Sequence, residues 1–119
     1  EDKMGLRSTM DYMSSSIESR ENKFTGNTTL AVVVTNAEFS KPQLCKIAGL
    51  AHNGYARSIN PVHTSADGDS IYAVSVGNVN ADQDLVGSLA AEVVSEALLR
   101  SVYNSESAYG LPAASDLGQ

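Results

Sequence analysis

The sequence predicts an α/β protein in which two strands alternate with two helices, after an arm with little regular structure. Two short runs rich in apolar and β-branched residues are typical of strands. Each is followed by a longer segment whose apolar residues recur at spacings of three and four, as they do on one face of a helix. At 119 residues the chain is long enough for one domain with a modest core.

The arm covers residues 1–27. A short helix is expected over residues 4–13. The segment 14–23 is almost entirely polar and cannot form a core by itself. We therefore expect residues 14–27 to form an exposed loop, which is where a chain is most easily cut.

The first strand is predicted over residues 29–36, which read TLAVVVTN. A continuous apolar run of this length is typical of a strand buried on both faces. A helix should follow, because Ser40 and Gln43 have the spacing of a capping box and Pro42 suits a first turn. Its expected apolar face consists of Leu44, Ile47, Ala48, Ala51 and Tyr55, and the helix should end before Asn60-Pro61.

A second strand is predicted over residues 70–76, after a turn at 66–69. Asp82 or Asp84 can cap a second helix that runs to about Tyr103, and a loosely ordered tail should follow. The expected buried stripe of this helix is Leu85, Leu89, Val93, Ala97 and Leu98, widened by Val86, Ala90, Val94 and Val102. Because two strands make a poor sheet, we expect another polypeptide or further copies of this chain to complete it.

Composition excludes several classes of function. The net charge is −6 and the basic residues are scattered singly, so no basic surface is expected to bind nucleic acid. No apolar run is long enough to span a membrane, and residues 1–13 lack the layout of a signal peptide, so a cytoplasmic protein is expected. The single cysteine, Cys45, allows no intrachain disulfide and is expected to pack as a small hydrophobe.

The junction Asn27–Thr28 carries the first candidate chemistry. If this bond were cut, Thr28 would have both a hydroxyl nucleophile and a free α-amine, as in an N-terminal-nucleophile hydrolase. The ordinary pKa of an α-amine, about 7.7–8.0, suits it to act as a general base near neutral pH. A plain junction between a loop and a strand has the same local pattern.

The turn Asp67-Gly68-Asp69 carries the second candidate chemistry. Both carboxylates can project near the end of the sheet where Thr28 lies, and there they can orient a hydroxyl or hold an ammonium group. An ordinary Asp-Gly turn also fits, whereas a calcium loop would need further oxygen ligands. His63 can line the same pocket. The histidines have no zinc spacing and the glycines no phosphate-loop spacing, so no metal or cofactor is expected.

The segments GNTTLAVVVTNA and NPVHTSADGDSIYAVSV resemble the small subunit of the L-aminopeptidase/D-esterase group, which includes β-peptidyl aminopeptidases and nylon-oligomer endohydrolases. The likeness covers residues 26–99 and is strongest to the 6-aminohexanoate-oligomer hydrolase type, whose nucleophile is threonine. It implies self-cleavage at Asn27–Thr28, with Thr28 as nucleophile and Asp67 and Asp69 as supporting carboxylates. Peptides or ω-amino-acid oligomers would be the substrates.

The resemblance also implies a four-layer α/β/β/α sandwich, of which this βαβα unit is one part, completed by a large subunit. Residues 1–27 would end the large-subunit portion and residues 28–119 would form the small subunit, with αβ units gathered into an oligomer. The family's oxyanion asparagine and catalytic lysine have no counterpart in residues 1–27, so we expect them on the large chain. Two alternatives stay open: an acyltransferase of the ornithine acetyltransferase type, and a non-catalytic oligomerisation module.

Overall fold

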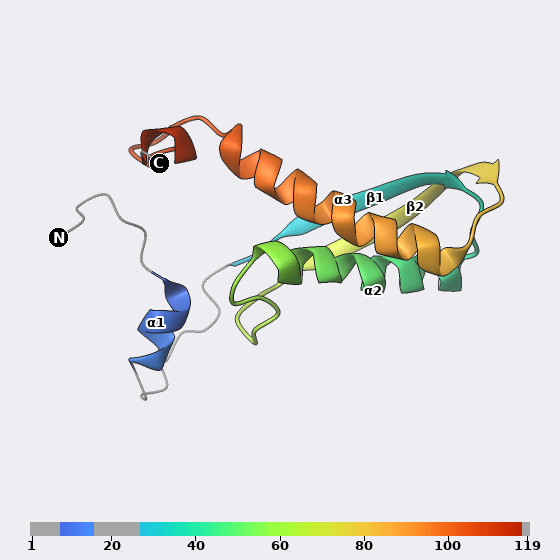
Figure 1. Cartoon of the computed structure of the whole chain (residues 1–119), viewed down its shortest axis with the longest axis horizontal. Coiled ribbons are helices and arrows are strands. Elements are labelled where there is room, and N and C mark those ends of the chain that lie inside the picture. Colours follow the sequence, from blue (N-terminus) through green and yellow to red (C-terminus); the bar gives the residue numbers. More distant parts are fainter. Residues whose placement is uncertain (1–7, 16–26, 118–119) are drawn as a thin grey trace.

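The computed structural model describes residues 8–15 and 27–117. Its elements are α1 (Thr9–Ser14), β1 (Leu30–Ala37), α2 (Lys41–Ser58), β2 (Ser70–Val79), α3 (Gln83–Tyr103) and a short 3₁₀ helix, η1 (Ala114–Asp116) (Figure 1). The α/β class and the β-α-β-α order are therefore confirmed. The helix expected over 4–13 is observed from Thr9, with residues 4–7 outside the described part, and most of the expected loop (16–26) lies outside it too.

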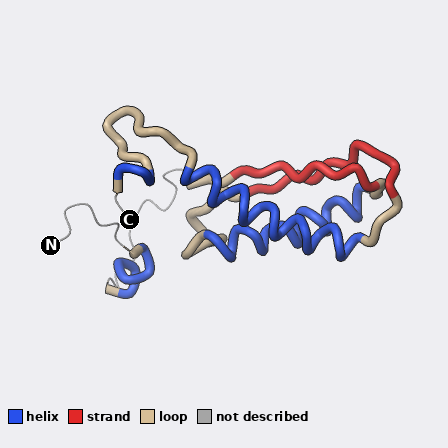
Figure 2. Tube along the Cα trace, turned by 45° about the horizontal axis from the view of Figure 1, so that its top comes forward, coloured by secondary structure: helices blue, strands red, loops and turns tan. Residues whose placement is uncertain are grey.

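The two strands run parallel, with a constant register from Leu30 opposite Ser70 to Thr35 opposite Ser75. An irregularity then leads to the pair Ala37 and Val79. Both α2 and α3 lie on the same side of this ribbon, which Figure 2 shows as one layer of strands beside one layer of helices. The described residues thus form two layers, and the four-layer sandwich stays a prediction.

Local signals start both long helices. At α2 the backbone N–H of Gln43 donates to Ser40 Oγ at 3.4 Å, and the backbone N–H of Ser40 donates to Gln43 Oε1 at 2.8 Å. The capping box is therefore confirmed. At α3 the Leu85 N–H donates to Asp82 Oδ1 at 2.9 Å, so Asp82 is the cap of this helix.

The core lies between α2, α3 and the inner face of the ribbon. Its buried members are Ile47, Ala51, Tyr55, Ile71, Ala90 and Val94. The predicted apolar face of α2 is confirmed, since Leu44 and Ala48 also pack against this core. The two helices approach closely at Gly54, where an added Cβ would lie 2.5 Å from the Ala91 carbonyl oxygen.

The predicted stripe of α3 is wrong in part. The face that meets α2 consists of small residues and one valine, namely Gly87, Ala90, Ala91 and Val94. The expected large members Leu85, Leu89, Val93 and Val102 are instead 49–65% exposed. Small side chains allow the close approach to α2, so the larger ones lie on the outer side of the helix.

The expectation that β1 is buried on both faces is not met within this chain. Its odd-numbered residues face the helices, whereas Leu30, Val32 and Val34 are 68%, 62% and 61% exposed. Tyr72, Val74 and Val76 of β2 are exposed on the same side. We call these six residues the open sheet face; nothing in the described part of the chain covers it.

Two smaller expectations also differ from the structure. Cys45 is exposed on α2, because it lies on the side of the helix opposite the core. The tail is more ordered than expected: the N–H of Ala113, which is buried, donates to Ser107 Oγ at 3.1 Å and Asp116 Oδ2 at 2.9 Å.

Among the described residues, no helix has the length and apolar character needed to cross a membrane.

Candidate active site

The starts of the two strands lie side by side. Asn27 and Asp67 form a parallel bridge just before β1 and β2, and the Gly68 N–H donates to the Asn27 carbonyl at 2.9 Å. The Ser70 N–H donates to the Thr29 carbonyl at 3.0 Å. The pair Asn27 and Asp67 has the same register as the pair Leu30 and Ser70 inside the strands, so residues 27–29 lie beside residues 67–69.

Thr28 therefore lies opposite Gly68. A Cβ added to Gly68 would lie 3.0 Å from Thr28 Oγ1, tighter than an ordinary contact. The absence of a side chain at Gly68 thus makes the room in which the threonine hydroxyl lies. The sequence predicts Thr28 and the turn Asp67-Gly68-Asp69 as separate candidates, and the strand pairing brings them together.

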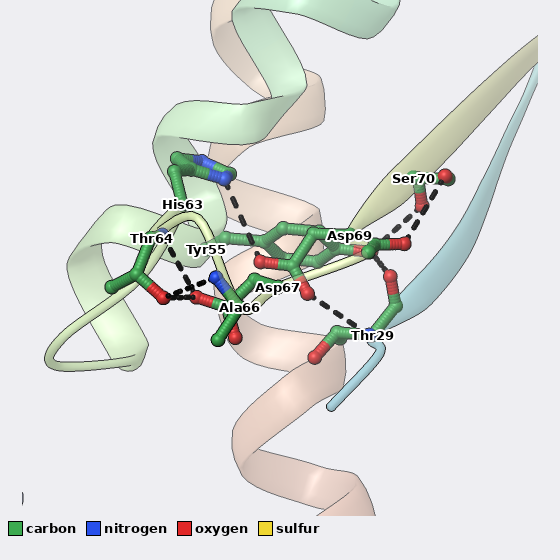
Figure 3. A network of polar contacts seen from close by, with 9 residues as sticks. Thr29, Tyr55, His63, Thr64, Ala66, Asp67, Asp69 and Ser70 are labelled. Carbon is green, nitrogen blue, oxygen red and sulfur yellow. Dashed lines mark hydrogen bonds and ion pairs between the residues drawn. The ribbon is translucent and has the colours of Figure 1, made fainter. Parts of the chain in front are cut away.

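Asp69 connects the second strand to the backbone of the first. Its Oδ1 accepts a hydrogen bond from the Thr29 N–H at 3.0 Å, and its Oδ2 lies 3.6 Å from His63 Nδ1 (Figure 3). The Asp69 side chain is only 6% exposed, whereas that of His63 is 40% exposed. A nearly buried carboxylate thus holds the residue that follows Thr28.

Asp67 is held by a different set of contacts. Its Oδ2 accepts hydrogen bonds from both the N–H and the hydroxyl of Thr64, each at 2.8 Å. These bonds, the one from the hydroxyl first, hold the pKa of the Asp67 carboxyl below its usual range. Asp67, which is a carboxylate at neutral pH in any case, therefore stays ionised to lower pH than an ordinary aspartate.

Tyr55 also belongs to this site, although the sequence predicts it only as part of an apolar helix face. It is buried, and its hydroxyl lies 3.1 Å from the Ser70 carbonyl oxygen and 3.3 Å from that of Thr29. Its ring meets the rings of His52 at 5.3 Å and His63 at 6.2 Å. The available signal was a tyrosine on the core face of a helix, since a buried phenol needs a hydrogen-bond partner.

His52 completes the ring cluster. Its ring lies 4.9 Å from that of His63, and its Nδ1 is buried without a hydrogen bond to any described residue. Burial, followed by the charge of His63, lowers the pKa of His52. His52 is thus held in its neutral form beside Tyr55.

A cavity of about 700 Å³ opens at the strand starts. Thr28, Asp67 and Asp69 line it together with Asn27, Thr29 and residues of the loop before β2, and Thr9 and Met13 of α1 also contribute. His63 is not among the described residues that line it, so this histidine reaches the site through Asp69. Within 8–15 and 27–117 no three His, Cys, Asp or Glu side chains gather as a metal site would require.

The hydroxyl of Thr28 and the carboxylates of Asp67 and Asp69 thus lie on the wall of one cavity at the start of a parallel α/β sheet. The chain belongs to peptidase family S58, whose sequence profile matches residues 4–114. This match extends beyond the likeness seen over residues 26–99 and confirms the family relationship.

Individual relatives agree with this family. An uncharacterized aminopeptidase of Mycobacterium bovis is 32% identical over 106 residues, which cover 76% of this chain and 31% of the relative. One from Mycobacterium leprae is 34% identical over 101 residues, covering 72% and 28%. The 6-aminohexanoate-oligomer endohydrolase of Paenarthrobacter ureafaciens is 32% identical over 89 residues, covering 64% and 25%. The chain thus spans less than a third of the length of these curated relatives.

Proposed function

We propose that this chain carries the nucleophile of an amide hydrolase that cleaves itself at Asn27–Thr28 and then acts through the new N-terminal threonine. The observation that carries the proposal is the juxtaposition of Thr28 with Gly68, between Asp67 and Asp69, on the wall of one cavity. The names of the relatives favour amide or peptide bonds as substrates, including bonds of ω-amino-acid oligomers.

Self-cleavage begins with attack of Thr28 Oγ1 on the carbonyl carbon of Asn27. The C–N bond breaks, the hydroxyl proton passes to the nitrogen, and the Asn27 acyl group becomes an ester of Thr28. This step frees the α-amine of Thr28. Water then hydrolyses the ester, which releases the Asn27 carboxylate and restores the Thr28 hydroxyl. The Gly68 N–H, 2.9 Å from the Asn27 carbonyl oxygen, is placed to stabilise the negative charge that develops there.

In turnover the free α-amine of Thr28 takes the proton of its own hydroxyl as that hydroxyl attacks a substrate carbonyl. The amine then protonates the leaving amine of the substrate, and water resolves the acyl ester. Asp69 holds the Thr29 N–H and so orients the N-terminal residue. Asp67, whose carboxylate is held in place by Thr64, supplies a negative charge beside the site for an ammonium group.

A large subunit is the partner that this proposal requires. The open sheet face is an apolar surface whose exposure is typical of an interaction site. A groove of about 630 Å³ between β1 and the outer side of α3 continues this surface. In the proposed division residues 1–27 end the large-subunit portion, residues 28–119 form the small subunit, and the sandwich is completed when the large chain packs on the open sheet face.

The experiment is an intact mass of the purified full-length protein and of its Thr28→Ala variant. We expect a wild-type chain that begins at Thr28 beside a separate upstream chain, and a single uncut mass for Thr28→Ala. Amidase activity should be present only in the wild type. An uncut wild type, or full activity in Thr28→Ala, would rule out this mechanism, and acyl transfer from acetylornithine to glutamate in place of hydrolysis would identify an acyltransferase.

A further inference from the structure

Tyr55 connects the two strand starts through one buried hydroxyl. The residue lies on α2 and is 1% exposed, and its side chain reaches from the helix to Thr29 and Ser70 at the beginning of the two strands (Figure 3). Its hydroxyl has a single proton for two backbone acceptors, the carbonyls of Ser70 at 3.1 Å and Thr29 at 3.3 Å. Tyr55 is therefore a contact between the helix layer and both strands at one point.

The two carbonyls belong to the residues that directly follow the proposed catalytic groups. Thr29 follows Thr28, and Ser70 follows Asp69. A shift of either strand start would change the distance between the threonine hydroxyl and the carboxylate, and with it the contact between Asp69 and the Thr29 N–H. A displacement of about 1 Å in a reacting group can lower a rate by on the order of 100-fold.

The surroundings of Tyr55 suit a fixed hydrogen-bond donor. His52 and His63 pack against its ring and restrict its movement. Burial, and then the negative charge of Asp69, raises the pKa of the Tyr55 hydroxyl, so the group keeps its proton through the range in which the enzyme would work. Water has little access to replace the bond, since the side chain is enclosed by the core.

We propose that Tyr55 is a positioning residue for the reactions of Thr28: by donating to the carbonyls of Thr29 and Ser70 it sets the relative position of the nucleophile and Asp69. The inference rests on the proposed function and adds to it a residue outside the reacting groups. Tyr55 touches neither substrate nor the cleaved bond in this role. Its effect reaches them through the backbone of the two strands.

The test is Tyr55→Phe in the full-length protein, which keeps the ring and removes only the hydroxyl. We expect self-cleavage and kcat to fall about tenfold or more, with KM changed less than about twofold, because substrate contacts are retained while alignment is lost. The Ser70 N–H donates to the Thr29 carbonyl, which the Tyr55 hydroxyl also contacts. Hydrogen exchange of the Ser70 amide should therefore become faster when the strand starts lose their alignment. Wild-type kcat and self-cleavage in Tyr55→Phe would overturn the inference.

A matched control separates positioning from stability. Ser58 lies on the same helix, and its hydroxyl bonds to Ser95 on α3, 2.6 Å from the Ser95 hydroxyl, and to neither strand start. Ser58→Ala also removes a partly buried hydroxyl and should keep the wild-type kcat at a temperature where both variants are fully folded. Equal losses of kcat in both variants would assign Tyr55 a structural role only. A wild type that is neither cut nor active would instead contradict the proposed function itself.

Discussion

Asp69 and Thr29 are joined across the two strands by a hydrogen bond of 3.0 Å from the Thr29 N–H to Asp69 Oδ1. The bond is shielded, because the Asp69 side chain is 6% exposed. Since Thr29 is the next residue after Thr28, this carboxylate acts directly on the backbone of the proposed nucleophile. Hydrogen bonds to charged groups contribute roughly 1.5–3 kcal/mol to stability, so the contact has both a structural and a chemical consequence.

Asp69→Asn separates these two consequences. The asparagine oxygen can still accept from the Thr29 N–H, so the fold should persist, whereas the negative charge near the Thr28 amine is lost. We expect kcat to fall on the order of 100-fold, within the range typical of groups that assist proton transfer. Steady-state kinetics on self-processed protein would measure this. Asp84→Asn, the same change on an exposed residue of the first turn of α3, should leave kcat unchanged; equal effects in both would refute the assignment.

Gly68→Ala should affect the reaction more than the fold. The added Cβ would lie 3.0 Å from Thr28 Oγ1, so the hydroxyl must move by a few tenths of an ångström. We expect self-cleavage, followed by the mass of the products over time, to slow about tenfold or more, because the attacking group is displaced. A variant that processes at the wild-type rate would show that the hydroxyl is not confined by Gly68.

Gly49→Ala is the counterpart of this substitution in α2. Nothing lies within 4 Å of the position that its Cβ would take, so no group has to move. Replacing glycine in a helix interior by alanine should stabilise the protein by up to about 1 kcal/mol. Gly49→Ala is therefore expected to raise Tm and to leave the rate of self-cleavage unchanged.

The elements that could be predicted from the sequence are those with local causes. The capping box at Ser40 and Gln43, the cap at Asp82 and the turn before β2 each depend on residues within four positions of one another. The site could be predicted only as separate pieces. Thr28 and Asp69 are 41 residues apart, counted from 28 to 69, and they become neighbours through the register of two parallel strands, which no local pattern encodes.

The features that the sequence predicted wrongly or missed are surfaces and long-range contacts. Apolar residues occur on more than one side of α3, so their spacing could not show that the small ones, such as Ala90 and Ala91, face α2. The hydroxyl of Tyr55 reaches residues 15 and 26 positions away, and the periodicity of α2 marks only the apolar ring. In both cases the deciding information is how closely two elements approach, which is a property of packing.

Thr64→Ala should change how stability depends on pH. Thr64 lowers the pKa of Asp67 in the folded protein, so the ionised carboxylate stabilises the fold above the unfolded pKa of about 3.9. This contribution is lost as the pH falls through the lower folded pKa. We expect the Tm difference between wild type and Thr64→Ala to be largest near pH 7 and to shrink below about pH 3. Thr64→Ser keeps the hydroxyl and should follow the wild type. A Tm difference between wild type and Thr64→Ala that does not depend on pH would show that Thr64 does not act through the ionisation of Asp67.

Val32→Glu tests whether the open sheet face receives the large chain. Val32 is 62% exposed in this chain and lies opposite Tyr72 in the middle of that face. A carboxylate there would be tolerated by the isolated small chain but would be buried without a partner in the assembled sandwich, at a cost of several kcal/mol. In the full-length protein we expect the large chain to be lost during size-exclusion chromatography, with activity lost in parallel. Asn53→Glu adds the same charge to the exposed side of α2 and should leave assembly intact. Normal assembly of Val32→Glu would mean that the large chain binds elsewhere, and that the exposure of this face has another cause.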